Sequence, residues 1–158
     1  DWIVDANMSI AKAIIKEGTR GIAAGAFLGC SRLISITIPN RMTSIGYSTF
    51  ASCSSLTSIT IPDSVTSIGE RAFIDCRGLT SIIIGNGVTN IKESAFNYCN
   101  NLGKVYYKGT KSDWSKISVE NKNTKLTAAT RYYYSETKPT DQGNYWHYDT
   151  DGVTPVIW

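Results

Sequence analysis

Apolar residues recur along this chain with a period of about 23 residues, and polar residues fill the positions between them. Four columns of identical residues keep this spacing: Phe27, Phe50, Phe73 and Phe96; Cys30, Cys53, Cys76 and Cys99; Leu33, Leu56, Leu79 and Leu102; Ile22, Ile45, Ile68 and Ile91. A repeat of roughly 20 to 29 residues with such a framework is typical of a solenoid. Each repeat then forms one coil, and stacking of the coils buries their apolar layers.

The most regular repeat divides into three segments. In the first, Ile59 and Ile61 alternate with polar residues, which predicts a half-buried strand. Pro62 is expected to end this strand because proline has no N–H to donate to a neighbour. We expect residues 63–69 to return the chain across the back of the coil, and residues 70–76 to fill the coil as a short helical turn.

The repeat pattern also extends towards the start of the chain, where it is degenerate. Val4 falls at the phenylalanine position and Asn7 at the cysteine position, and the regular pattern ends at Tyr107. We therefore predict repeats over residues 1–108 and a C-terminal cap over residues 109–158. The chain opens in mid-pattern, without an initiator Met or a signal peptide, so we expect a fragment that begins inside a repeat.

The four cysteines occupy one equivalent position in consecutive repeats. This placement predicts free, buried thiols that act as small apolar residues with weak hydrogen bonding. Disulfides between neighbouring coils are the alternative, because equivalent Cα atoms would lie ~4.8 Å apart, within the range that a disulfide tolerates.

Two motifs carry a family resemblance. Ala-Phe-x-x-Cys-x-x-Leu-x-x-Ile-x-Ile-Pro spans residues 26–39 and, with Thr for Ala, residues 49–62, while Ile-Gly-x-x-Ala-Phe spans residues 68–73. They resemble the BspA-type leucine-rich repeats of bacterial surface proteins. The resemblance implies a right-handed leucine-rich-repeat solenoid, export to the cell surface or beyond it, and attachment to host matrix proteins or other cells. It implies no conserved active site.

The C-terminal residues have a different character. Residues 110–117 predict a short helix in which Ser112 is the N-cap and Asp113 lies near the positive end of the helix. Residues 130–135 predict a strand, and residues 145–158 predict an aromatic β-hairpin around an Asp-Gly turn. We expect this segment to cover the apolar layer of the last coil.

Composition excludes several classes of function. The hydrophobic share of 42% and the charged share of 18% are those of a globular protein. The net charge is only +3 and the basic residues are scattered, so nucleic acid is not an expected partner. Apolar runs stay well below the roughly 18 residues that a membrane helix needs, so membrane insertion is not expected either. We expect a monomer.

The sequence offers little for catalysis. His147 is the only histidine, and it lies in the predicted hairpin. Gly-x-Ser-x-Gly, Cys-x-x-Cys and Gly-rich phosphate-loop motifs do not occur. Residues 149–152 resemble the start of a calcium loop but lack its remaining ligands. We therefore expect no catalytic residues, no metal site and no cofactor. Asn7-Met8-Ser9 matches the short acceptor motif for glycosylation.

The expected function is binding of a host or neighbouring-cell protein or glycan at the concave face of the sheet. Tyr106 is the candidate anchor, helped by Ile83 and Lys104, because interface hot spots are enriched in aromatic residues and arginine. The outward strand positions predicted to form the surface are Ser35, Thr37, Ser58, Thr60, Ser81, Ile83, Lys104 and Tyr106.

Two alternatives stay open. The repeats could act only as a structural spacer that presents another domain, since Ser and Thr are ordinary solvated strand residues. The hairpin could instead provide an aromatic platform for sugar rings or cell-wall choline. Its candidate residues are Tyr145, Trp146, Tyr148 and Trp158.

Overall fold

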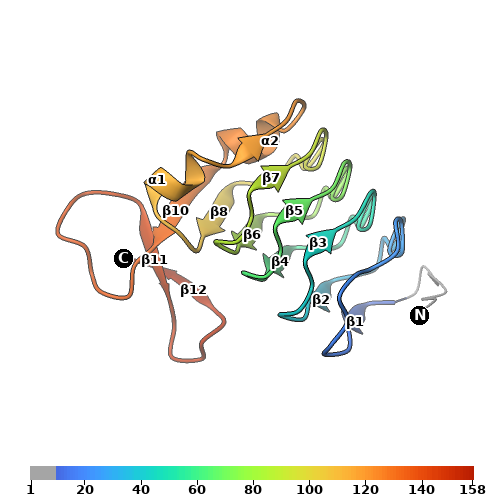
Figure 1. Ribbon diagram of the computed structural model, residues 1–158, viewed down its shortest axis with the longest axis horizontal. Coiled ribbons are helices and arrows are strands. Elements are labelled where there is room, and N and C mark those ends of the chain that lie inside the picture. Colours follow the sequence, from blue (N-terminus) through green and yellow to red (C-terminus); the bar gives the residue numbers. More distant parts are fainter. Residues whose placement is uncertain (1–9) are drawn as a thin grey trace.

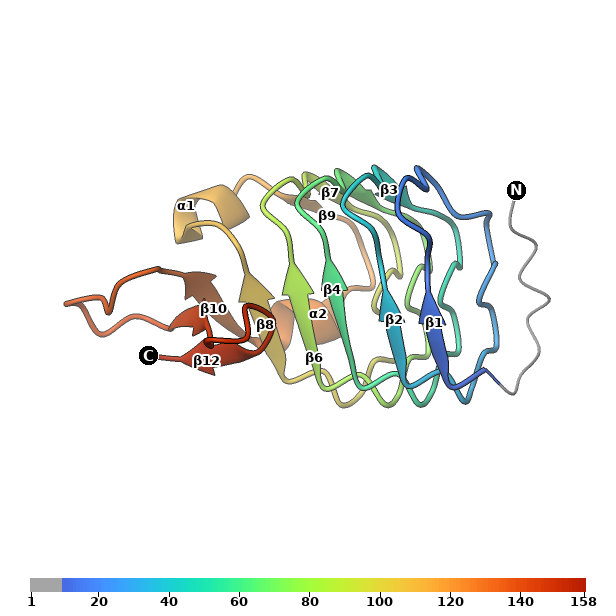
Figure 2. The ribbon, with the colours of Figure 1, turned by 90° about the horizontal axis from the view of Figure 1, so that it is seen from below.

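The structure, a computed structural model, describes residues 10–158 and is a solenoid of stacked coils (Figure 1). The first strand, β1 (Lys12–Ile14), lies at one end of the stack, and the C-terminal hairpin lies at the other (Figure 2). The predicted repeat positions Val4 and Asn7, and the glycosylation motif that begins at Asn7, lie outside the described residues.

One side of every coil is a strand of the sheet that we call the front sheet. Its strands are β1, β2 (Ser35–Thr37), β4 (Ser58–Ile61), β6 (Ser81–Ile84), β8 (Lys104–Tyr107) and β10 (Thr130–Tyr134). β1 pairs with β2, and β4, β6, β8 and β10 pair in that order, all in parallel; β2 lies beside β4 (Figure 2). Equivalent residues of successive repeats face each other, as Ile59 and Ile82 do. The strand prediction is confirmed.

A second side of the coils forms a narrower sheet, the back sheet. It contains β3 (Ser44–Ile45), β5 (Ser67–Ile68), β7 (Asn90–Ile91) and β9 (Ser118–Val119), all parallel. The sequence predicted a return of the chain here but not a second sheet.

The third side consists of consecutive turns in place of the expected helical turn. Ile74 N–H donates to the Arg71 carbonyl at 3.1 Å, and Cys76 N–H to the Phe73 carbonyl at 3.2 Å. Arg71 and Asp75 have positive φ angles of 57° and 61°. Residues in this left-handed region cannot continue a right-handed helix, so each turn stops after one hydrogen bond. The same two positions have positive φ in the other coils: Gly25, Gly29, Ser48, Ser52, Ser94 and Tyr98.

The core consists of stacked columns of side chains. Neighbouring phenylalanine rings lie 5.1 to 5.3 Å apart, nearly parallel, from Phe27 to Phe96. All four cysteines are buried and free, as predicted. Each thiol after the first donates to a phenylalanine carbonyl of the preceding coil, as Cys99 Sγ does to Phe73 O at 3.0 Å. The buried thiol therefore satisfies a backbone acceptor as well as filling space.

The helix after the last regular strand, α1 (Lys111–Trp114), has Thr110 as its N-cap, so the assignment of Ser112 was wrong. Thr110 Oγ1 accepts from Asp113 N–H at 3.1 Å, and Asp113 Oδ2 accepts from Thr110 N–H at 3.2 Å. This capping box satisfies two N–H groups at once. The helix therefore begins one residue before Ser112.

Asn123, just before α2 (Thr124–Ala128), closes the turn side of the last coil. In the coil before, Phe73 N–H donates to the Ala95 carbonyl at 2.8 Å; Phe96 N–H donates instead to Asn123 Oδ1 at 3.0 Å. The Asn123 amide also donates to the Lys92 carbonyl at 2.9 Å. A buried side chain thus provides the hydrogen bonds that a further coil would have made.

Two more strands extend the front sheet. β11 (Tyr145–Tyr148) pairs in parallel with β10, and β12 (Pro155–Ile157) pairs antiparallel with β11 to form the hairpin. Both sheets thus continue past residue 108 through β9 and β10, while the boundary between repeats and cap at that position stays a prediction. No helix within residues 10–158 is long and apolar enough to cross a membrane.

The phenylalanine column should dominate stability. Phe73 is 0% exposed and stacks between two other rings, so Phe73→Ala should lower the free energy of unfolding by about 3 to 5 kcal/mol. Ser58→Ala, on the exposed face of β4, should change it by less than about 0.5 kcal/mol. Urea unfolding followed by circular dichroism measures both; equal shifts would contradict the stacked core.

The buried thiols make the free energy of unfolding depend on pH in the alkaline range. Burial raises the pKa of the Cys99 thiol from its ordinary value of 9.0 to about 12. The unfolded chain loses this proton above pH 9, whereas the folded chain keeps it. The contribution of the protonated thiol to the free energy of unfolding is therefore fully present below pH 9 and is lost as the pH rises towards 12. Between pH 8 and pH 10, the wild type should lose about 1 kcal/mol more unfolding free energy than Cys99→Ala. Identical losses in urea titrations would contradict this.

Candidate functional site

The outward side of the front sheet, which we call the strand face, has two rows of side chains on its last strands. They arise because β6, β8 and β10 pair in register. The polar row is Ser81, Lys104 and Thr130, and the apolar row is Ile83, Tyr106 and Tyr132. The rows are two residues apart along each strand, so their side chains point to the same side of the sheet.

The C-terminal hairpin covers the apolar row. Trp146 is 0% exposed, and its indole packs edge-on against the Tyr106 ring at 5.5 Å. Its Nε1–H donates to the Tyr107 carbonyl at 3.0 Å. Tyr106 and Tyr132 stack on each other with ring centres 5.5 Å apart. Together with Ile83 these residues form a second, small core outside the solenoid.

An ion pair ties the covered edge of the sheet to an earlier coil. Lys108 Nζ lies 2.6 Å from Asp63 Oδ2 and 5.8 Å from the centre of the Tyr148 ring. Burial alone would lower the pKa of the Lys108 ammonium. The hydrogen bond to Asp63 and the neighbouring tyrosines outweigh burial, so this pKa lies above its ordinary value. Lys108 therefore stays charged and helps to hold the hairpin.

The polar row stays open beside the hairpin. A cleft of about 460 Å³ lies over it, between the sheet and β12. The lining residues are Thr80, Ser81, Asn101, Gly103, Lys104, Tyr106, Thr130, Tyr132 and Pro155. Lys104 and Thr130 are exposed and Ser81 is half-buried. The cleft thus combines hydroxyl groups and one ammonium with an aromatic wall.

The structure distributes the predicted binding residues between two environments. Ser35, Thr37, Ser58 and Thr60 are exposed on the strand face. Ser58 is in line with Ser81 and Lys104, whereas Thr60 is in line with Ile83 and Tyr106. Ile83 and Tyr106 also point outward, but they are only 7% and 5% exposed because the hairpin lies over them. The predicted anchor Tyr106 is therefore part of a core, and little of its side chain is free for a partner.

Sequence reasoning missed the cleft residues from the C-terminal segment, namely Thr130, Tyr132 and Pro155. Thr130 pairs with Lys104 at a spacing greater than the regular period, because the last coil contains α1 and is longer than the others. This strand could have been predicted as the next one of the sheet only by extending the repeat pattern past residue 108 and allowing for an insertion in the last coil.

The four aromatic residues of the alternative site do not form one surface. Trp146 and Tyr148 lie on the side of the hairpin that packs on the strand face. Tyr145 alternates with them along β11 and hydrogen-bonds to Asp141 at 2.9 Å. Trp158 stacks on His147 with ring centres 3.9 Å apart and is 41% exposed. Of the four, Trp158 is the most open to solvent.

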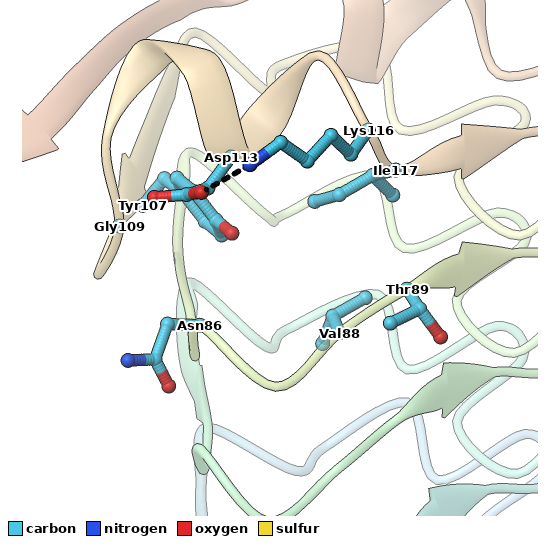
Figure 3. A pocket seen from close by; sticks show the side chains of 8 residues that line it. All are labelled: Asn86, Val88, Thr89, Tyr107, Gly109, Asp113, Lys116 and Ile117. Carbon is cyan, nitrogen blue, oxygen red and sulfur yellow. Dashed lines mark hydrogen bonds and ion pairs between the residues drawn. The ribbon is translucent and has the colours of Figure 1, made fainter.

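A second hollow, of about 270 Å³, lies between α1 and the coil beneath it (Figure 3). Asp113 and Lys116 are its charged residues, and the Asp113 carboxylate is already paired with Thr110 and, at 3.0 Å, with Lys116. These hydrogen bonds lower the Asp113 pKa to about 2. The hollow therefore presents no unpaired carboxylate. Among residues 10–158, no cluster of His, Cys, Asp or Glu has the arrangement of a metal site.

The sequence model of the BspA type leucine rich repeat region matches residues 6–127 in six copies. The chain belongs to this family. The family assignment and the leucine-rich-repeat solenoid predicted from the sequence are thereby confirmed. No protein of curated function is significantly similar to the chain.

Solved structures of other leucine-rich repeat proteins are similar to this BspA-type chain. A leucine rich cell surface protein of Faecalibacterium prausnitzii is 38% identical with a TM-score of 0.68, over 71% of this chain and 30% of that protein. A T. pallidum leucine rich repeat protein is 31% identical with a TM-score of 0.61, and the match covers 63% of this chain and 46% of that protein. The pneumococcal vaccine antigen PcpA shares the fold. It is 21% identical with a TM-score of 0.64, and the match covers 80% of this chain and 31% of that protein. The chain thus spans less than half of each protein.

Trp146 should be the residue that holds the hairpin on this BspA-type solenoid. Trp146→Ala should release the hairpin and make the chain cleavable after Glu136, an exposed residue between β10 and β11, while the coils keep their circular dichroism spectrum, because the indole is buried only outside the main core. Trp158→Ala, which alters a 41% exposed residue, is the matched control and should be cut much more slowly. Limited digestion with a glutamate-specific protease, followed by mass spectrometry, measures both; equal cleavage rates would contradict the anchoring role.

Proposed function

We propose that the chain is a non-enzymatic binding module of a bacterial protein that is secreted or held at the cell surface. It adheres to a protein or glycan of a host or a neighbouring cell through the strand face. The observation that carries this proposal is the contrast between the two rows of the strand face. The hairpin buries the apolar row, whereas the polar row and its cleft stay accessible.

Three features support the strand face as the contact surface. Its hydroxyl groups on β2, β4 and β6 continue directly into the cleft, so one ligand can contact several strands. Side chains on paired strands are held at fixed spacing, which lowers the entropy lost on binding. The similar protein of Faecalibacterium prausnitzii is described as a leucine rich cell surface protein, which agrees with an extracellular position.

The spacer function remains the second candidate. It is favoured by the uniformity of the strand face far from the cleft, where Ser35, Thr37, Ser58 and Thr60 are small, exposed and chemically alike. Large specific interfaces are enriched in aromatic residues and arginine, and this part of the face has none. Binding of sugar or choline to the tail is supported only by the exposed stack of Trp158 on His147.

A matched pair of substitutions tests the strand face. Ser58→Glu puts a carboxylate on the face next to Ser81, and Ser44→Glu makes the same change at an exposed position of the back sheet. On an array of matrix proteins, mucins and glycans, Ser58→Glu should weaken wild-type binding about tenfold or more, by steric and charge conflict in the contact surface. Ser44→Glu should bind as the wild type does.

Both variants must first give the melting temperature of the wild type. Equal weakening by both variants would assign binding to another surface. Failure of the wild type to bind any member of the array would favour the spacer function for this chain.

A further inference from the structure

From the lining of the cleft we infer its ligand class: the cleft is a subsite for a sugar residue that bears a carboxylate, such as a sialic or uronic acid. The inference rests on the proposed function, because it names the ligand of the strand face. The carboxylate would meet the Lys104 ammonium, and the ring hydroxyls would meet the polar row.

Lys104 is a free cation at the centre of the cleft. Its side chain is exposed, and none of the ion pairs within residues 10–158 includes it. The cleft lining contains no Asp or Glu, and the outward positions of β1 to β8 contain two lysines, Lys12 and Lys104, but no acidic residue. An anion therefore meets an unneutralised charge with no repulsion from the walls. One ammonium matches the single charge of a carboxylate.

The flanking side chains can recognise hydroxyl groups. Ser81 and Thr130 stand in register on either side of Lys104, so their Cα atoms lie roughly 4.8 Å from it on the neighbouring strands. Neither hydroxyl is used in a hydrogen bond within the described residues, whereas Thr80 donates to the Thr57 carbonyl at 3.1 Å. A hydroxyl both donates and accepts, as a sugar hydroxyl does, so the two can pair in either direction.

The size and walls of the cleft favour a small ring over a protein segment. Its volume of about 460 Å³ lies at the lower end of the range of small-molecule sites. Tyr132 and Pro155 provide apolar walls beside the polar row, which suit a pyranose with a C–H face and a hydroxyl rim. The closed hairpin fixes these walls, since Trp146 holds β11 against the sheet.

Titration calorimetry with three oligosaccharides tests the inference. Sialyllactose and a hyaluronan tetrasaccharide carry the two sources of carboxylate, and lactose is the neutral reference. At least one acidic sugar should bind about tenfold more tightly than lactose at ~0.15 M salt, and the one that does identifies the source.

Lysine variants then locate the contact. Lys104→Ala should lower affinity for the acidic sugar about tenfold, and Lys104→Arg should restore most of it because the positive charge is kept. Lys125→Ala on α2 removes another exposed lysine that has no ion pair within the described part of the chain, and it should bind as the wild type does. The melting temperatures of all three variants should equal that of the wild type.

Several outcomes overturn the inference, and they separate it from the proposed function. Equal affinity for lactose and the acidic sugars, or acidic binding that Lys104→Ala leaves unchanged, overturns the acidic subsite while glycan binding stands. Binding of proteins from the array without any of the three sugars overturns it while the strand face stands. Absence of all binding overturns both.

Discussion

Every coil of this protein depends on the next coil to complete it. A single coil cannot enclose its own apolar layer, so its phenylalanine ring, its strand residues and many of its backbone groups find partners in adjacent coils. The hydrogen bonds make the same point. Phe50 N–H donates to the Ala72 carbonyl of the next coil, and Cys76 Sγ donates back to the Phe50 carbonyl. The repeat length is therefore fixed by pairing between coils, because a shift by one residue would separate all these partners together.

A stack of this kind needs a different solution at its end. Here side chains replace the missing coil: Asn123 bonds to the backbone of the coil before it, and the Arg131 guanidinium lies over the Trp114 ring at 4.1 Å. Arg131 Nε is buried without a hydrogen-bond partner among residues 10–158, so the stacking compensates only part of its desolvation. The hairpin then folds back on the front sheet and covers the apolar outward residues of its last strands.

The sequence was sufficient to predict those parts of the structure that follow from the 23-residue repeat. The front-sheet strands from β1 to β8 and the phenylalanine and cysteine columns are all implied by equivalent positions. It was insufficient for the back sheet, because a two-residue strand such as Ser67–Ile68 is too short to show an alternating pattern. At α1, Thr110 and Ser112 are both good N-cap residues, and only the hydrogen bond that Asp113 N–H donates to Thr110 Oγ1 decides between them.

The candidate site was predictable only in part for a related reason. That Ser81 and Lys104 point outward follows from strand alternation, but the burial of Tyr106 depends on Trp146, which lies much further along the chain and outside the repeat. The contact between them arises from the path of the tail, and no local pattern encodes it. Sequence reasoning therefore placed these side chains on the outward side of the sheet but overestimated the free surface of the largest of them.

The position of the cleft follows from the same physics as the solenoid itself. Coils that carry the same residue types in register form rows of similar side chains, and such rows make a nearly flat surface. A hollow can form only where the regularity is broken, and here β12 stands above the sheet beside Lys104 and Thr130. The residues that end the stack thus also create the cleft on the strand face. The cap and the candidate site are coupled in this protein because both consist of side chains that depart from the repeat.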